Sequence, residues 1–401
     1  MTAALLPAYP GDWLEASLRF LHVVAAVAWI GASFYFIALN NHLRPPAQHD
    51  DADRGVGGEA WEIHGGGFYR VEKFRSVPRT LPEPLHWFKW EAYTTWLSGF
   101  SLFVVLYYLN AGTYMVDRSV ADISPGAAVG ISIGLLVAAW IVYDLLSRAL
   151  PGEDALLGAL VAGLTVLAAW GSGELFAARA AWIQVGAMLG TIMAANVFFV
   201  IIPAHWELIR AKQAGREPDP RWGARGKQRS VHNNYLTLPV LVTMLSNHWG
   251  FLYARSWSWA VLVCLMATTA LVRHYFNLRH RGWNVWPILV AAAAALAAIG
   301  WLIRPQSTVP AAATGPVSFA QAQAIVQNRC VTCHSLHPTR SGFDAPPKGI
   351  AFDTPAEIVA RAQQIDQWAV QSQAMPLGNL TGMTEQERAT LGAWIAQGAH
   401  R

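Results

Sequence analysis

Long apolar runs dominate this sequence and constrain its fold more than any other feature. A helix that spans a bilayer needs about 20 predominantly apolar residues. Eight runs have this character, at 14–40, 92–111, 125–149, 154–171, 180–203, 235–253, 257–276 and 284–303. Only 13% of the residues are charged, whereas an ordinary soluble domain contains about a quarter. The sequence therefore predicts an all-α fold built on an eight-helix transmembrane bundle.

The chain divides into an apolar part and a polar part. We expect the transmembrane domain to cover 1–303, with a long cytoplasmic loop at 41–90. Residues 304–316 are rich in proline, alanine and threonine, a composition typical of a linker. The polar segment that follows, 317–401, is expected to fold as a separate small domain.

Three short helices are expected in the polar segment, at 317–334, 355–370 and 384–398. Thr384 stands before the last of them, with Glu387 three residues later. This spacing predicts a capping box, in which the two side chains satisfy free backbone groups at the helix start. The arrangement is similar to a small class I cytochrome c domain.

The run from Cys330 to His334 reads Cys-Val-Thr-Cys-His, and this spacing is typical of c-type haem attachment. Cys330 and Cys333 are expected to hold haem c covalently, and His334 to ligate its iron. A tetrahedral zinc site would need further Cys or His ligands, and the third cysteine, Cys264, lies in an apolar run. We therefore expect one covalent haem c.

A methionine before the last helix is the usual sixth iron ligand of class I cytochromes c, and the resemblance therefore implies Met375. Met375 precedes Pro376 in this position. Met383 is the alternative, but it lies against the start of the final helix. A His/Met ligand pair raises the haem potential, so the domain is expected to accept electrons.

The haem motif sets the expected orientation in the membrane, and the distribution of charge tests it. Haem c is attached outside the bacterial cytoplasmic membrane, so the C-terminal domain is expected in the periplasm, and eight spans place the N-terminus there too. The loops that then face the cytoplasm hold most of the basic residues, including Arg210, Lys212 and Arg216, whereas few, such as Arg118 and Arg179, face outward. This is the positive-inside distribution.

The histidines fall into two layers by expected depth, and ionisable residues inside a membrane usually serve a function. His22 and His248 form the outer layer, near the expected docking side of the haem domain. They are candidate ligands of a second haem, of b type, or of a metal. Alternatively, they are interfacial histidines that hydrogen-bond to their neighbours.

The inner layer gathers polar groups at the cytoplasmic helix ends. The candidate substrate-binding or catalytic residues there are His64, Glu72, Lys73, His86, Trp90, Glu91, His232, Asn233, Asn234, His274 and Asn277. They predict a polar substrate cavity. The alternative is a solvated rim, because helix ends carry polar residues in any membrane protein.

The loop at 41–90 contains its own structural signal. Three consecutive glycines, Gly65 to Gly67, stand between aromatic and charged flanks, and Val71 to Phe74 has modest strand character. Glycine clusters of this kind mark turns, so the second part of the loop is expected to form a hairpin or a close-packed loop.

Several of these segments together resemble the bacterial membrane-bound urate oxidase family, also called urate hydroxylases. The resemblance is carried by His22–Gly31, Glu62–Phe74, Phe88–Tyr93, His232–His248 and the terminal haem motif. Members of that family have an eight-helix N-terminal domain fused to a cytochrome c. The resemblance covers nearly the whole chain.

The resemblance implies oxidation of urate to 5-hydroxyisourate, with water supplying the oxygen. Two electrons would pass to the fused haem c and on to the respiratory chain through a cytochrome c or a terminal oxidase, without a need for hydrogen peroxide. Trp87, Trp90 or Tyr235 could stack on the purine, and Lys73 or an asparagine amide could bind its oxygens. A histidine such as His232 or His274 could act as the base, because its ordinary pKa lies near neutrality.

Distance sets a further condition, because the bilayer core is about 30 Å thick. Urate bound in the inner layer would be too far from a periplasmic haem for one direct electron step. Either His22 and His248 hold a bridging redox centre, or urate binds near the outer face. Two other functions stay open: a quinol–cytochrome c oxidoreductase, and a membrane anchor or transporter with an electron-carrier tail.

Overall fold

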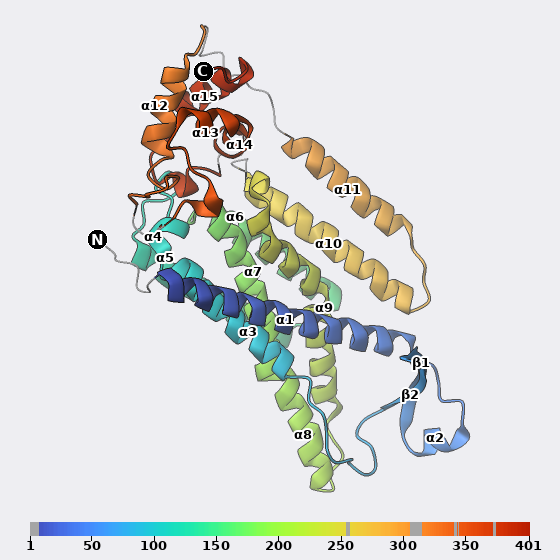
Figure 1. The fold of residues 1–401 in the computed structure, drawn as a ribbon. Helices are drawn as coiled ribbons and strands as arrows, with labels where there is room; N and C mark the ends of the chain where they lie inside the picture. The colour runs from blue at the N-terminus through green and yellow to red at the C-terminus, as the bar shows by residue number, and fades with distance from the viewer. Residues whose placement is uncertain (1–7, 254–256, 305–314, 341–342, 344, 372–373) are drawn as a thin grey trace.

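The computed structural model describes residues 8–253, 257–304, 315–340, 343, 345–371 and 374–401. Figure 1 shows a bundle of long helices with the small C-terminal domain at one end and a β-hairpin at the other. The predicted linker, 304–316, lies almost wholly outside the described residues.

The bundle contains nine of the described α-helices. They are α1 (Ala8–His42), α3 (Trp90–Phe103), α5 (Pro125–Ala149), α6 (Asp154–Gly173), α7 (Ala178–Ala195), α8 (Ile202–Gln213), α9 (Pro220–Leu245), α10 (Ser258–His280) and α11 (Pro287–Ile303). A π-helical turn, Val104–Tyr108, extends α3 towards the short helix α4 (Ala111–Tyr114), and a second, Asn196–Ile201, joins α7 to α8.

Five helical segments of the described chain are long and apolar enough to cross a membrane. They are Tyr9–His42, Pro125–Ala149, Asp154–Gly173, Ala178–Gln213 and Ser258–His280, and each contains most or all of one predicted apolar run. Of the other three predicted runs, 92–111 forms most of α3 and the π-helical turn that extends it to Tyr108, and 284–303 forms the 17-residue α11. Run 235–253 is only the second half of α9 and the turns after it. The fold is compatible with a membrane protein, and the count of eight spans stays a prediction.

The polar segment expected as a loop before residue 235 is largely helical. Helix α7 continues through α8 to Gln213, and α9 begins at Pro220. Asp219 caps α9, since its carboxylate accepts a hydrogen bond from the Arg221 backbone N–H at 2.9 Å, and proline at the first helical position suits this start. His232 and Asn233 therefore lie within a helix and not in a loop.

The loop at 41–90 contains an antiparallel hairpin, so the fold is not wholly α-helical. Strand β1 (Val56–His64) pairs with β2 (Gly67–Phe74), and the register places His64 opposite Gly67. Gly65 and Gly66 have φ values of 56° and 81°, a backbone region that glycine enters without steric cost. The predicted hairpin and its glycine turn are confirmed.

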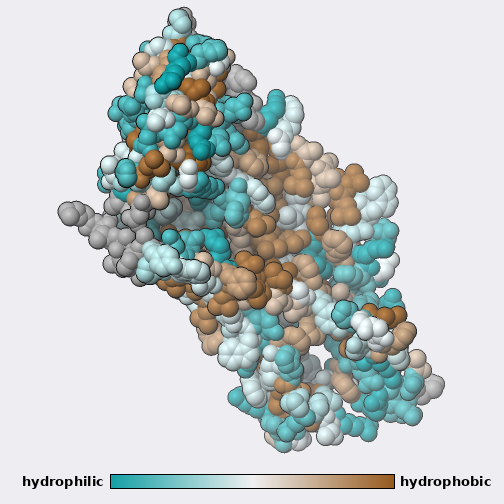
Figure 2. Space-filling model, viewed as in Figure 1, coloured by the Kyte–Doolittle hydropathy of each residue, from teal (hydrophilic) through white to brown (hydrophobic). Residues whose placement is uncertain are grey.

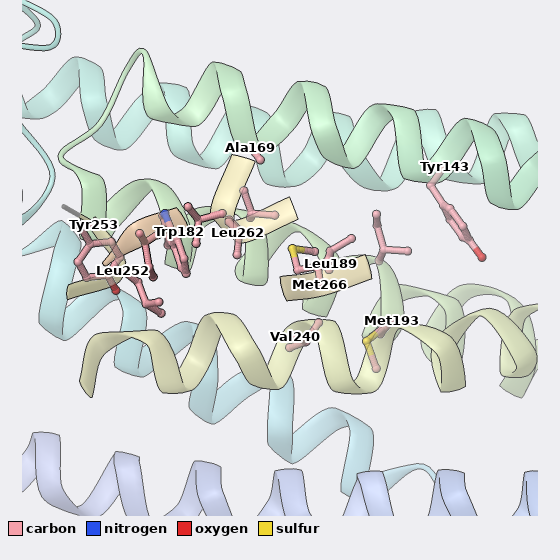
Figure 3. Close-up of a cluster of buried hydrophobic side chains, with 14 residues drawn as sticks. Tyr143, Ala169, Trp182, Leu189, Met193, Val240, Leu252, Tyr253, Leu262 and Met266 are labelled. Carbon is pink, nitrogen blue, oxygen red and sulfur yellow. The ribbon is translucent and has the colours of Figure 1, made fainter. Parts of the chain in front are cut away.

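Large apolar side chains form the bundle core between α5, α6, α7, α9 and α10. Figure 3 shows Trp182 and Tyr253 together at one end, Leu262, Leu189 and Met266 along the middle, and Tyr143 at the other end. The Trp182 and Tyr253 rings meet edge to face, with centroids 5.1 Å apart.

Apolar residues also cover much of the outside of the bundle. Figure 2 shows a hydrophobic band between the more hydrophilic C-terminal domain and hairpin regions. Phe20 on α1 is 74% exposed, and Leu167 on α6 and Leu145 on α5 are also exposed. A soluble monomer rarely shows a continuous apolar surface of this extent, so the exterior fits a lipid environment.

The C-terminal domain is built from short helices. They are α12 (Phe319–Arg329), α13 (Pro355–Ala360), α14 (Ala362–Ile365) and α15 (Glu385–Ala396). The capping box of Thr384 and Glu387 is present, as predicted. Trp394 and Leu391 of α15 pack with Val326 and Ile358 in the core of this domain. Its identity as a cytochrome c domain stays a prediction.

The C-terminal domain rests on the end of the bundle where α10 begins. The 3-10 turn Gly250–Tyr253 contacts the π-helical turn Asp366–Gln371. A Cβ atom at Gly250 would overlap the ring of Trp368, so glycine allows this close approach. Helix α4 contacts the turn Leu377–Asn379, which directly follows Met375 and Pro376.

Candidate functional site

A network of buried polar side chains crosses the bundle interior at the end away from the C-terminal domain. Its members come from α5, α7 and its π-turn, α9 and α10: Asp144, Asn196, Arg229, Asn233, Asn234, Arg273 and Asn277. Burying such groups is costly unless they are hydrogen-bonded. Three of them, Asn233, Asn234 and Asn277, were predicted from the sequence to lie at a polar site.

Arg229 anchors one half of this network. Its guanidinium donates to Asp144 Oδ1 at 2.7 Å and to Asn196 Oδ1 at 3.2 Å. Asn196 Nδ2 donates in turn to Asn233 Oδ1 at 2.9 Å and to the Tyr143 hydroxyl at 3.3 Å. Arg229 also lies 4.8 Å from the centre of the Tyr143 ring, within the range of a cation–π contact.

Arg273 anchors the other half. It donates to Asn277 Oδ1 at 2.8 Å and lies 4.1 Å from the centre of the Phe34 ring. Asn277 Nδ2 donates to Asn234 Oδ1 at 3.1 Å, and Asn234 reaches Ser33 on α1 at 3.4 Å. The network therefore connects α10, α9 and α1.

Two tyrosine–histidine pairs adjoin the network. The Tyr143 hydroxyl lies 2.7 Å from His232 Nδ1, and the Tyr235 hydroxyl lies 2.7 Å from His274 Nδ1. His232 and His274 were both predicted candidates. Each pair joins two helices: Tyr143 and His232 join α5 with α9, and Tyr235 and His274 join α9 with α10.

A cavity of about 600 Å³ opens beside these pairs, between α1, α6, α9 and α10. Tyr143, His232, Tyr235 and Asn277 contribute to its wall, together with Asn40, Asn41, Asp154, Lys227 and Arg281. The volume lies within the range of about 300–1,000 Å³ that small-molecule sites have. The cavity combines neutral hydrogen-bonding groups with one negative charge, Asp154, and two positive charges, Lys227 and Arg281.

Lys73 of the hairpin reaches the edge of the same cavity. Its ammonium group donates to the side chain of Asn40, which is part of the cavity wall. Burial lowers the pKa of Lys73 from its ordinary value, and the nearby charge of Lys227 lowers it further. Three cationic side chains, Lys73, Lys227 and Arg281, therefore stand around one cavity.

The other predicted inner-layer residues lie away from the cavity wall. His64 is exposed at the hairpin tip, and His86 is exposed and packs edge-on against Phe88 at 4.7 Å. Glu72 belongs to an ion-pair cluster of the hairpin, 3.0 Å from Arg54.

Trp90 and Glu91, at the start of α3, also stand apart from the cavity wall. Trp90 is 66% exposed and contacts Tyr93. Glu91 Oε2 is buried and has no hydrogen-bond partner among the described residues. The inner layer thus separates into a cavity group and a peripheral group.

The two histidines of the predicted outer layer have different surroundings. His22 Nδ1 lies 3.0 Å from the Thr95 carbonyl and 3.3 Å from Ser98 Oγ, and its ring packs on Gly99 of α3. A histidine held through Nδ1 has Nε2 free for a metal. His248 is an exposed residue of a 3-10 turn. Within the described chain, no hydrogen bond or ring contact joins His22 to His248, and no cluster of three or more His, Cys, Asp or Glu residues could hold a metal ion.

The haem-attachment motif forms a turn directly after α12, which ends at Arg329 and not at 334. The backbone N–H groups of Cys333 and His334 both donate to the Cys330 carbonyl, at 3.2 and 2.9 Å. This turn brings the two thiols and the imidazole together. His334 Nδ1 lies 2.9 Å from the Ile350 carbonyl, so Nε2 stays available for iron. The residues present therefore fit a covalent haem c.

Burial changes the pKa values of two groups in this motif. It raises the pKa of the Cys330 thiol to about 12 and lowers the pKa of His334 below its ordinary value. His334 is therefore neutral at neutral pH, which is the form that binds iron.

Both methionines named from the sequence lie in the same apolar cluster. Met375 is partly buried and packs there with Cys330 and Ile350, whereas Met383 is only 3% exposed. The Met375 backbone is held by the Trp368 carbonyl at 2.8 Å and by Arg388 Nη1 at 2.8 Å. The assignment of Met375 as sixth ligand stays a prediction.

Sequence reasoning missed several residues of the cavity and its network. They include Asn40, Tyr143, Asp144, Arg229 and Arg273. A signal was present for Asp144, because a charged residue inside an apolar run is usually functional or paired. Arg229 could not be distinguished in the sequence from the many other basic residues around it.

The polar end of the cavity and the haem motif lie at opposite ends of the bundle. Helix α10 begins next to the contact with the C-terminal domain and lines the cavity from Val263 to Asn277, 5 to 19 residues later. At 1.5 Å per residue, the polar end of the cavity at Asn277 is about 28 Å from that contact, and the apolar end at Val263 is about 8 Å from it. The distance condition derived from the sequence therefore applies to a substrate bound at the polar end of this cavity.

The chain matches the model of a known protein family over most of its length. Residues 8–304 match the family described as urate oxidase N-terminal. This region contains the whole bundle, the hairpin, the cavity and both tyrosine–histidine pairs. No curated protein and no solved structure matches the chain. Because the match covers most of its length, the chain belongs to the urate oxidase N-terminal family.

Proposed function

We propose that the chain oxidises urate to 5-hydroxyisourate in the cavity beside His232 and Tyr235, and that the electrons leave through a haem c held by Cys330, Cys333 and His334. Membership of the family indicates a urate-related oxidoreductase. The observation that supports this location is a cavity of suitable size whose wall contains neutral donors and more cationic than anionic side chains, the anionic one being Asp154, which accepts a hydrogen bond from Gln228. Such a site suits a planar anion with several carbonyl oxygens.

Different residues of the cavity would contact different groups of the bound urate. Lys73, Lys227 and Arg281 attract the anion, and Asn277 offers an amide to its oxygens or ring nitrogens. Tyr143 and Tyr235 present aromatic and hydroxyl groups. Trp87 and Trp90, named as stacking partners from the sequence, take no part in this proposal, because Trp87 stacks on Trp206 at 4.8 Å and Trp90 is exposed.

Filling the cavity tests its role. Ala270 forms part of its wall, and Ala270→Trp is expected to abolish urate oxidation because the indole occupies the substrate volume. Ala294→Trp is the matched control, since Ala294 is exposed on α11 and the indole there faces the apolar surroundings. Equal covalent haem content with loss of activity in the first variant alone supports the proposal. Undiminished activity of Ala270→Trp contradicts it.

Lys73 gives the activity an expected pH dependence. Its pKa is lowered from 10.5, so the ammonium loses its charge at a lower pH than an ordinary lysine. The KM for urate is expected to rise by about fivefold as pH rises through this lowered pKa, which corresponds to the roughly 1 kcal/mol of a partly exposed ion pair. In Lys73→Arg, which stays charged, the rise should be absent. Identical alkaline profiles for both proteins would refute this role of Lys73.

When bound, haem c supplies a one-electron acceptor outside the bundle. His334 would ligate its iron through Nε2, and Met375 is our proposal for the opposite ligand. We propose that the C-terminal domain and the N-terminus lie in the periplasm of a bacterial inner membrane. The basic ends of α8 and α9, at the opposite end of the bundle (Figure 1), support this orientation. A cytochrome c or a terminal oxidase would then receive the electrons.

The distance between the polar end of the cavity and the haem motif supports a second redox centre in the bundle. We propose His22 as one ligand, because its Nδ1 is already bonded and Gly99 lets the ring pack closely against α3. His248 is the proposed partner from the sequence, and its exposed position makes it the weaker assignment. Acid–acetone extraction should release a non-covalent haem from the wild type and none from His22→Ala, while covalent haem stays equal. A single covalent haem and no metal in the wild type would exclude this second centre.

A further inference from the structure

We infer that the two tyrosine–histidine pairs have opposite roles towards the substrate, one as a hydrogen-bond donor and the other as a proton acceptor. His232 presents an N–H donor to the substrate, whereas Tyr235, backed by His274, removes a proton from it. This inference rests on the proposed function and assigns roles inside the same cavity. It is carried by the directions of the hydrogen bonds around Tyr143.

Two groups with fixed roles determine those directions. Arg229 can only donate, so the Asn196 atom that it contacts at 3.2 Å is the amide oxygen. The Met193 carbonyl can only accept, so the Asn233 atom 2.9 Å from it is the amide nitrogen. The remaining atoms of the two amides, Asn196 Nδ2 and Asn233 Oδ1, then form a donor–acceptor pair at 2.9 Å. Arg229 lies on α9 and Met193 on α7, and both require the same assignment of the amide oxygen and nitrogen atoms.

This arrangement fixes the tautomer of His232. Asn196 Nδ2 also donates to the Tyr143 oxygen at 3.3 Å, so the Tyr143 hydroxyl proton is directed to His232 Nδ1 at 2.7 Å. A neutral imidazole that accepts at Nδ1 carries its proton on Nε2. His232 forms part of the cavity wall, so it offers the substrate a donor and not a base.

The second pair has no comparable restraint. Within the described chain, the hydrogen bond recorded for the Tyr235 hydroxyl is the one to His274 Nδ1. Tyr235 forms part of the cavity wall and His274 stands behind it. No amide donor holds the Tyr235 oxygen in an accepting role, so this hydroxyl can give its proton to His274 and take another from the cavity.

The proton step balances without a further reactant. A substrate N–H, or the O–H of the attacking water, breaks as its proton bonds to the Tyr235 oxygen. The Tyr235 O–H breaks at the same time, and its proton bonds to His274 Nδ1. No electrons leave in this step. The complete oxidation of urate by water releases two electrons and two protons, and a haem c held by Cys330, Cys333 and His334 would supply a one-electron acceptor.

The test makes the same substitutions at both histidines. A glutamine amide can replace an N–H donor but cannot accept a proton. We expect His232→Leu to raise the KM for urate about tenfold, the effect of one lost hydrogen bond, and His232→Gln to recover part of that loss. We expect His274→Leu and His274→Gln alike to lower kcat about 100-fold or more, as loss of a general base does, with little change in urate binding. Tyr235→Phe should lower kcat to the same extent as the two His274 variants. His86→Gln, outside the cavity, is the control.

A spectroscopic measurement reads the tautomer directly. In the holoprotein labelled with ¹⁵N-histidine, the signals absent from His232→Gln should show an unprotonated Nδ1 and a protonated Nε2. Loss of kcat at His232 with retention at His274, or an Nδ1–H tautomer at His232, overturns the inference while the proposed function stands. Failure of the wild type to oxidise urate overturns the proposed function itself.

Discussion

Replacing Arg229 by methionine is expected to lower the free energy of unfolding by about 3 kcal/mol, because it leaves a buried carboxylate poorly compensated. The Arg229 side chain is only 4% exposed and lies 2.7 Å from Asp144. The expected loss is at the lower end of the range for buried pairs, since Arg148 still contacts Asp144 at 2.7 Å. The substitution also removes the hydrogen bond that orients Asn196.

Arg148 provides a matched control within the same ion-pair group. Its side chain is 64% exposed, so Arg148→Met should cost no more than about 1 kcal/mol. Unfolding of the detergent-solubilised variants, followed by tryptophan fluorescence, compares the two. The double variant Arg229→Met with Asp144→Leu should recover much of the lost stability, because no charge stays buried. Equal stability losses for the two single arginine variants would contradict this account.

The second large effect is expected at the haem motif. His334→Ala should abolish urate-driven reduction of the protein, because it removes the imidazole whose Nε2 is free for iron. Met375→Ala should keep the covalent haem but lower its reduction potential, since a His/Met pair raises that potential. Optical spectra and a redox titration distinguish the two outcomes.

Met383 is the control for Met375. It is buried in the same apolar cluster, and Met383→Leu conserves volume, so a cost below about 1.5 kcal/mol is expected. The reduction potential of the Met383→Leu variant should equal that of the wild type. A drop in potential for Met383→Leu, with none for Met375→Ala, would show that Met383 is the ligand.

Local sequence signals predicted the local structure well. Gly65 and Gly66 indicated a turn, and the capping box of Thr384 and Glu387 marked the start of α15. The start of α9 also had a local signal, Asp219 before Pro220, but the basic residues after it favoured a loop. Helix α9 forms because its partners, α7 and α10, bury its polar face, and that information is not local.

The functional site was predictable only in part for the same reason. His232, His274 and Asn277 were found because polar groups at membrane depth are unusual. Their partners were not, because Tyr143 and His232 are separated by 89 positions and Asp144 and Arg229 by 85. His64 and His86 carry the same chemical signal as His232, and only tertiary packing separates an exposed histidine from one in a cavity wall.

The most direct test of the account is to mix the purified holoprotein with urate in the absence of oxygen and record its visible spectrum. We predict that the absorption band of reduced haem c appears and that 5-hydroxyisourate forms. Ala270→Trp should show no band with urate but a full band with a chemical reductant. A wild-type haem that a chemical reductant reduces, but urate does not, would contradict the proposed function.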